Sequence, residues 1–125
     1  MSNAPTVSQA TLDQLLSPST ATLTSVLKGH GLGTTFMHDV APLKPDMKMA
    51  GRSYTLRYIP AREDLNDVPM DNLTDKQRIG IEEMKSGDVL VIDARGDTRA
   101  GTMGSILAER LRQKGVAGLV TDGAY

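Results

Sequence analysis

The chain has 125 residues, which is the length of one domain, and its 14 lysine and arginine residues nearly balance its 15 aspartate and glutamate residues. This balance and the scarcity of aromatic side chains argue against direct binding of nucleic acid, and the absence of cysteine excludes disulfides and thiolate metal sites. No apolar run approaches the roughly 18 residues of a membrane span, and residues 1–10 lack the pattern of a secretory signal. We therefore expect a cytoplasmic protein without membrane contact.

The first third of the chain predicts two short helices followed by an irregular segment. Leucines recur at helical spacing after Ser8, a candidate N-cap, and a second helix begins after Ser19. The apolar stripe expected on the second helix consists of Leu23, Val26 and Leu27. Residues 31–49 contain prolines and predict irregular structure, with short extended pieces around Phe36 and Val40.

The middle third predicts one strand and one helix. Residues 50–60 alternate between apolar and polar side chains and predict a half-buried strand with the inward positions Tyr54, Leu56 and Tyr58. Residues 61–72 form a polar loop. The helix that follows opens with a capping box from Thr74 to Gln77 and ends at Gly87. Its expected inward side chains are Ile79, Ile81 and Met84.

The last third predicts a strand, a helix and a second strand joined by short turns. Residues 88–93 form a near-continuous apolar strand, residues 104–115 a helix, and residues 116–122 a second buried strand. The inward side chains expected on the helix are Ile106, Leu107 and Leu111. This order is typical of a right-handed parallel βαβ crossover, and it predicts an α/β fold.

The turn before this helix is rich in glycine but matches neither common phosphate-binding motif. Gly96 and Gly101 have the spacing of a P-loop, yet Thr102 and Met103 stand where that motif needs lysine and a hydroxyl residue. With its next glycine at Gly104, the turn also lacks the G-x-G-x-x-G pattern of dinucleotide sites. The sequence therefore argues against a nucleotide site here.

Two interpretations of the glycine turn remain. The first is a tight connection in which glycine supplies conformational freedom and close packing. The second is a site for a small carboxylate, because backbone N–H groups of residues 101–105 and the helix dipole would lie together at the carboxyl edge of the sheet. No histidine, cysteine or lysine stands beside the turn, so covalent and Schiff-base mechanisms have no evident carrier.

The stretch GDVLVIDARGDTRAGTMGSILAERLRQKGVAGLVTDGA, residues 87–124, resembles the core of the RraA-like family. That family includes the regulator of ribonuclease activity A and the divalent-metal 4-hydroxy-4-methyl-2-oxoglutarate aldolases. STATLTSVL and GRSYTLRYIPARED extend the resemblance upstream, so that it spans roughly residues 17–125. The YIPARED variant is similar to a subgroup usually labelled as ribonuclease regulators.

The resemblance implies a layered β/β/α sandwich of the swivelling, phosphohistidine-domain-like type, built on a parallel βαβ core and assembled as trimers or hexamers. We expect residues 1–125 to form a single RraA-like domain. The chain stops at Tyr125, one turn beyond a parallel strand, at the edge where such sheets bind ligands. We therefore expect this domain to be truncated on its C-terminal side.

The resemblance also implies a site. In the family's aldolases a loop at a helix N-terminus holds the pyruvyl carboxylate through backbone amides, and the matching residues here are Gly104, Ser105, Ile106 and Leu107. An Arg-Asp pair that binds substrate and Mg²⁺ or Mn²⁺ would follow Tyr125, so no metal ligand is expected within the chain. The cation would act as a Lewis acid on the enolate.

Two departures from the family pattern affect this interpretation. Ser105 stands where the aldolases usually carry an acid that helps hold metal-bound water. The family's Asp-Asn after the middle strand is replaced by Asp64 and Leu65, so that Asp64 either keeps the family role or is a solvated loop carboxylate. Asp93 and Asp97 flank the turn and Arg99 could reach an anion from it; each either assists the site or serves as a strand-end, turn or surface residue.

Three functions follow from the resemblance. The first is a metal-dependent lyase acting on a 2-oxo acid, by retro-aldol cleavage that releases pyruvate or by decarboxylation of the oxaloacetate type. The second is a regulator that binds a ribonuclease without catalysis, which Ser105 mildly favours because serine adds no charge. The third is a related lyase or dehydratase acting on sugar-derived acids.

Overall fold

The computed structural model of this protein describes residues 6–62, 64–65 and 71–125. The polar loop predicted at residues 61–72 therefore lies partly outside the described residues. The chain divides into two compact units, Met1–Ala50 and Gly51–Tyr125. Across the described ranges, no helix combines the length and the hydrophobicity needed to cross a bilayer.

The first unit contains the two predicted helices, α1 (Gln9–Leu15) and α2 (Thr20–Gly29). Both serine caps are confirmed, because the side chain of Ser8 accepts a hydrogen bond from the Thr11 backbone and that of Ser19 from the Thr22 backbone. The expected apolar stripe of α2 is wrong at Val26, whose side chain is 55% exposed, and no residue of α2 is buried.

The segment after α2 contains bends and turns but no strand, so no extended piece around Phe36 or Val40 joins a sheet. Pro42 and Pro45 have no backbone N–H, so they cannot donate the hydrogen bonds that a strand within a sheet needs.

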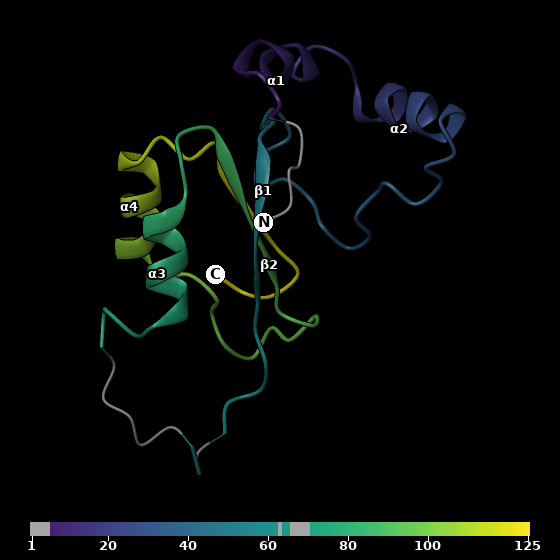
Figure 1. Ribbon diagram of the computed structural model, residues 1–125. Helices are drawn as coiled ribbons and strands as arrows, with labels where there is room; N and C mark the ends of the chain where they lie inside the picture. Colours follow the sequence, from purple (N-terminus) through teal and green to yellow (C-terminus); the bar gives the residue numbers. More distant parts are fainter. Residues whose placement is uncertain (1–5, 63, 66–70) are drawn as a thin grey trace. The chain divides into compact units, whose positions relative to one another are not determined.

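The second unit is an α/β layer built on three parallel strands. Its elements in chain order are β1 (Arg52–Arg57), α3 (Lys76–Glu83), β2 (Asp88–Asp93), α4 (Ser105–Gln113) and β3 (Gly118–Thr121). The sheet order is β1-β2-β3, so each helix connects two neighbouring parallel strands. The predicted parallel βαβ arrangement is confirmed, and α3 and α4 lie side by side over one face of the sheet (Figure 1).

The core lies between that face and the two helices. Leu90 and Ile92 of β2 are essentially inaccessible to solvent, and they pack with Ile81, Met84 and Leu111 from the helices. The register places Tyr54, Leu90 and Leu119 in one row across the sheet, so the outer strands complete the same layer. The alternation predicted for β1 is confirmed, since its inward residues are half-buried and its outward residues are exposed.

The start of α3 differs from the sequence prediction. The N-cap is Asp75, whose carboxylate accepts a hydrogen bond from the Arg78 backbone N–H at 2.8 Å, and it replaces the expected cap at Thr74. Two cap-forming residues are adjacent here, and the carboxylate is the stronger acceptor of the helix N–H groups. The helix also ends at Glu83, and Gly87 adopts a positive φ in the turn that enters β2.

The orientation expected for Ile106 is wrong, because its side chain is 83% exposed. Leu111 is buried and Leu107 packs against the core one turn earlier, so these two residues define the inward side of α4. Ile106 is the second residue of the helix and lies about 100° around the axis from Leu107, which turns it to solvent.

Candidate functional site

Two loops meet at the carboxyl edge of the sheet: residues 94–104 between β2 and α4, here termed the glycine loop, and residues 122–124, here termed the post-β3 turn. The Asp122 carboxylate joins them by accepting the backbone N–H of Ala94 at 2.6 Å and of Gly96 at 2.8 Å. These donors hold the pKa of Asp122 below its usual value, so this carboxylate is ionised at neutral pH and fixes the start of the glycine loop.

The start of the glycine loop is a tight turn, in which one glycine provides the conformational freedom that the sequence suggested. Arg95 and Gly96 have φ values of 61° and 67°, and the Asp97 N–H donates to the Ala94 carbonyl at 3.1 Å. Positive φ is readily adopted by glycine but is uncommon for arginine. Gly104, in contrast, has an ordinary extended conformation, so its backbone angles do not require glycine.

Thr102 is the best-connected residue of the glycine loop and is only 6% exposed. Its backbone N–H and its hydroxyl both donate to the Ala124 carbonyl, at 2.7 and 2.9 Å, and its own carbonyl accepts from Gln77 Nε2 at 2.7 Å. The N–H of Thr102 is therefore occupied by protein, so the free donors expected over residues 101–105 do not include it.

The first turn of α4 lacks the N-capping side chain that the other helices have. In the described part of the chain, α1, α2 and α3 each begin with a side chain that accepts a hydrogen bond from the first turn, whereas α4 begins at Gly104 without one. The first N–H groups of a helix have no partner within it. At Ser105, Ile106 and Leu107 these groups therefore remain available to a bound molecule.

The space above Gly104 is also open. A Cβ atom placed on Gly104 would have no neighbouring atom within 4 Å, and Ser105 and Ile106 are exposed. Glycine at this position thus leaves room next to the helix N-terminus, where the helix dipole favours an anion. The arrangement has the shape and the polarity needed to receive a small carboxylate.

Asp97 and Arg99 lie in the glycine loop but hold each other, with Arg99 Nη2 and Asp97 Oδ2 2.7 Å apart. The guanidinium lowers the pKa of Asp97 well below its usual range and the carboxylate raises the pKa of Arg99. Arg99 is 85% exposed and Asp97 38% exposed at the side chain, so the pair faces solvent. Asp93 is similarly paired with Arg57 at 2.8 Å.

Asp64 forms an exposed ion pair with Arg62, two residues before it. The arginine lowers the pKa of this carboxyl group. Among the interactions found for the described residues, none links Asp64 to the glycine loop or to α4. The structure therefore brings Gly104, Ser105, Ile106 and Leu107 together with Asp97 and Arg99 nearby in the chain, but it gives Asp64 no contact with them.

The carboxylates at this edge do not form a complete metal site. Over the described residues, no group of three or more histidine, aspartate or glutamate side chains converges on one point. Asp93, Asp97 and Asp122 are each engaged by arginine or by backbone N–H groups. The described residues at this edge thus do not fit a divalent cation by themselves.

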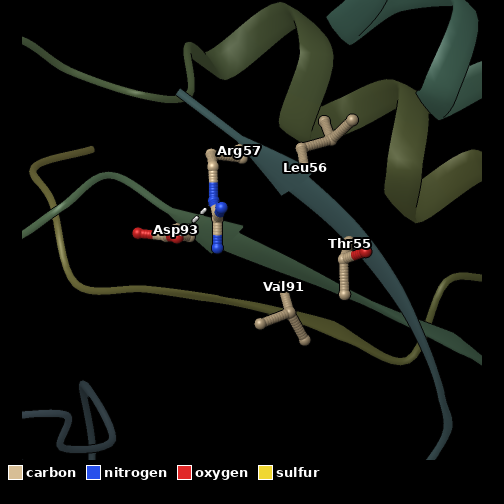
Figure 2. A pocket seen from close by; sticks show the side chains of 5 residues that line it. All are labelled: Thr55, Leu56, Arg57, Val91 and Asp93. Atoms are coloured by element: carbon tan, nitrogen blue, oxygen red, sulfur yellow. Dashed lines mark hydrogen bonds and ion pairs between the residues drawn. The ribbon is translucent and has the colours of Figure 1, made fainter. Parts of the chain in front are cut away.

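A shallow hollow of about 400 Å³ lies on the side of the sheet away from α3 and α4. Figure 2 shows Thr55 and Val91 on this side, the Arg57–Asp93 ion pair at its rim, and Leu56 pointing the other way toward the helices. The hollow carries one satisfied ion pair and no further charged side chain, so it offers little to orient a polar substrate.

Comparison with known proteins places these features in a family. The family model described as "RraA-like: Aldolase/RraA" matches residues 13–125. Among curated proteins, no sequence matches this chain.

Two solved structures share the fold. Streptomyces coelicolor RraAS2, described as an unusual member of the RNase ES inhibitor RraA protein family, is similar with a TM-score of 0.80, 29% identity and 93% coverage of this chain. An uncharacterized protein from Pseudomonas syringae pv. tomato has a TM-score of 0.74, 23% identity and 98% coverage. The present chain spans 55% and 53% of those two chains, about half of their length. Because the family model matches residues 13–125, this chain belongs to the RraA-like family.

Proposed function

We propose that this protein is a divalent-metal-dependent lyase that acts on a 2-oxo acid and releases pyruvate. The observation that supports this most is the first turn of α4, which begins at Gly104 without a capping side chain and is open to solvent. The chain belongs to a family described as Aldolase/RraA. By resemblance to the aldolases of that family, this turn would bind the substrate carboxylate.

The chemistry of the turn suits a 2-oxo acid. Backbone N–H groups at Ser105, Ile106 and Leu107 would donate to the substrate carboxylate, and the helix dipole would favour its charge. Retro-aldol cleavage breaks a carbon–carbon bond and leaves negative charge on the pyruvate fragment, which positive groups must stabilise. The proposal assigns this role to an arginine expected after Tyr125.

Mg²⁺ or Mn²⁺ enters the proposal through the family resemblance alone. The described carboxylates do not supply its ligands, so the proposal places an aspartate ligand in the same expected pair after Tyr125. Asp64, Asp97 and Arg99 would act around the site only if the full-length protein reorganises their ion pairs.

The finer architecture is proposed on the same basis. We infer that residues 1–125 belong to a longer RraA-like domain of the layered β/β/α swivelling type, which forms trimers or hexamers in the cytoplasm. This is supported by the family match and by the half-length coverage of the two solved structures.

The test is an assay of the full-length protein with oxaloacetate and with 4-hydroxy-4-methyl-2-oxoglutarate, in the presence of Mg²⁺ or Mn²⁺. Pyruvate release is followed with lactate dehydrogenase and NADH. We expect turnover that is lost on chelation of the cation and restored by its return. Pyruvate release no faster than with the cation alone, for every 2-oxo acid and either cation, would contradict the proposal.

A second function, binding of a ribonuclease without catalysis, is favoured by one residue and one relative. Ser105 lacks the charge that the family's aldolases carry at this position, and RraAS2 is described as belonging to an RNase ES inhibitor family. Ser105→Glu separates the two functions, because it should raise kcat/KM for a lyase and leave ribonuclease binding unchanged. Tight binding of an RNase ES-type enzyme without pyruvate release by either variant would favour the regulator.

A further inference from the structure

Thr102 joins four segments that are distant in sequence. Its contacts reach the post-β3 turn, the strand β3, the first turn of α3 and the residue that follows β1. Because Thr102 is buried and lies two residues before the N-cap of α4, these contacts decide where α4 begins.

On one side, Thr102 holds the post-β3 turn. The Ala124 carbonyl accepts both the N–H of Thr102 at 2.7 Å and its hydroxyl at 2.9 Å, which uses both lone pairs of that oxygen. The same hydroxyl oxygen lies 3.4 Å from that of Thr121, whose oxygen accepts the Gly123 N–H at 3.0 Å. The backbone just before Tyr125 is thereby tied to the glycine loop.

On the other side, the Thr102 carbonyl is held by two side chains. Gln77 Nε2 donates to it at 2.7 Å and the Tyr58 hydroxyl at 3.3 Å. Burial and the charge of Asp75 raise the pKa of Tyr58, so its hydroxyl stays protonated and remains a donor at neutral pH. The peptide units on both sides of Thr102 are therefore fixed.

Packing leaves the post-β3 turn little freedom to move away. A Cβ atom on Gly123 would lie 2.6 Å from Ala94 Cβ, which is closer than real Cβ atoms approach, and a tight 3.1 Å from Thr102 Cγ2. Glycine is required at this contact by close approach. The glycine loop and the post-β3 turn are thus tied together by hydrogen bonds and by close packing.

We propose that Thr102 is a positioning residue that sets the distance between the N–H donors of the α4 first turn and the backbone at Ala124. The inference rests on the proposed function for its substrate class, a 2-oxo acid bound at Gly104–Leu107. A 2-oxo acid held at the α4 turn would then lie at a distance from the Ala124 backbone that the Thr102 hydroxyl maintains.

The test compares three variants of the full-length protein. Thr102→Val removes the hydroxyl while keeping the shape, Thr102→Ser keeps the hydroxyl, and Thr55→Val is a matched control on the opposite side of the sheet. Without any ligand, Thr102→Val should shift the backbone amide resonances of both the α4 first turn and residues 123–125. Thr102→Ser and Thr55→Val should leave both sets near their original positions.

With Mn²⁺ present, pyruvate is the binding probe. Thr102→Val should weaken pyruvate binding about fivefold, the equivalent of one net hydrogen bond, and raise KM while leaving kcat nearly unchanged, because the carboxylate contacts act in substrate and transition state alike. If Thr102→Val does not fold, Thr102→Ala removes the same hydroxyl and should give the same pattern. Unchanged amide positions and pyruvate affinity in a folded variant would overturn the inference.

Failure of the proposed function gives a different result. If the parent protein neither binds pyruvate nor releases it, the lyase proposal fails. The amide measurement then still decides whether Thr102 couples the two segments.

Discussion

The helices α3 and α4 begin at the same edge of the same sheet, yet their first turns differ in one important way. At α3 the Asp75 carboxylate accepts a hydrogen bond from the helix, so the chain satisfies its own donors. At α4 the cap is Gly104, which has no side chain to do so. The difference shows that a fold can stabilise one helix end internally and leave the equivalent end free for a ligand.

The largest effect is expected from removing one backbone N–H donor from the first turn of α4 without disturbing the helix. Ser105 is the first helical residue, where proline is well tolerated, and Gly104 before it is already extended. Ser105→Pro should therefore fold normally but weaken pyruvate binding by roughly 10- to 100-fold, the equivalent of one charge-assisted hydrogen bond.

Titration calorimetry with the full-length protein would measure this loss. Ser105→Ala keeps the N–H and should bind as the parent does, and Thr20→Pro at the start of α2 controls for proline itself. Equal affinity of Ser105→Pro and the parent would show that the α4 turn does not hold the carboxylate.

The opposite change tests the closed helix end. Asp75→Ala removes the cap of α3 and should lower the free energy of unfolding by about 1 kcal/mol. Pyruvate affinity should not change, because the α3 donors face the protein's own side chain. Urea denaturation measures the free energy of unfolding, and titration calorimetry measures the pyruvate affinity. A large loss of affinity would mean that the two helix ends are not independent.

A capping side chain at position 104 would make the first turn of α4 similar to that of α3. Gly104→Ser adds a hydroxyl in open space, and it should accept the Leu107 N–H as Ser8 accepts that of Thr11 in α1. We expect a gain of a few tenths of a kcal/mol in stability together with weaker pyruvate binding, because hydroxyl and carboxylate compete for one donor. Gly104→Ala is the control that fills the space without accepting a hydrogen bond, and equal losses in both variants would point to crowding.

The smallest expected effect concerns the loop that leads into α4. Hydrogen bonds from Ala94 and Gly96 hold the pKa of Asp122 below its unfolded value. The ionised carboxylate therefore stabilises the fold above about pH 4, and this contribution is lost as the pH falls through the folded pKa. Asp122→Asn should be less stable near neutral pH and lose less stability on acidification.

Urea denaturation of both proteins from about pH 3 to pH 7 would measure this difference. Arg110 and Arg112 lower the pKa values of Glu82 and Glu109 to about 2 in both proteins, so their contributions cancel in the comparison. Parallel pH profiles would show that Asp122 does not carry the effect.

Local features of the fold could be predicted from the sequence because their causes are local. Ser8 and Ser19 cap the helices that directly follow them, and the apolar run of residues 88–93 is the central strand. The orientation of Ile106 could not be predicted from spacing. Helical periodicity defines the apolar stripe along α4, but Ile106 lies in the first turn at the edge of that stripe and is exposed.

The contacts of the candidate site were harder to predict because they join distant residues. Thr102 meets Ala124 and Gln77, which are 22 and 25 residues away, and no local pattern records such pairs. The polar Gln77 did stand out, but its position suggested a capping box. The α4 turn could be proposed as a carboxylate site because a glycine and the predicted start of a helix are adjacent in the sequence.

Two arginines near the carboxyl edge of the sheet have a consequence for how an anion would arrive. Arg57 and Arg99 are each neutralised by a neighbouring aspartate, so they project little positive field into solvent. Arg95, in the same loop as Arg99, forms none of the ion pairs found among the described residues, so a carboxylate would be attracted by this arginine as well as by the helix end. We therefore expect its association rate to fall as ionic strength rises, but less steeply than at sites that collect anions with several unpaired arginines.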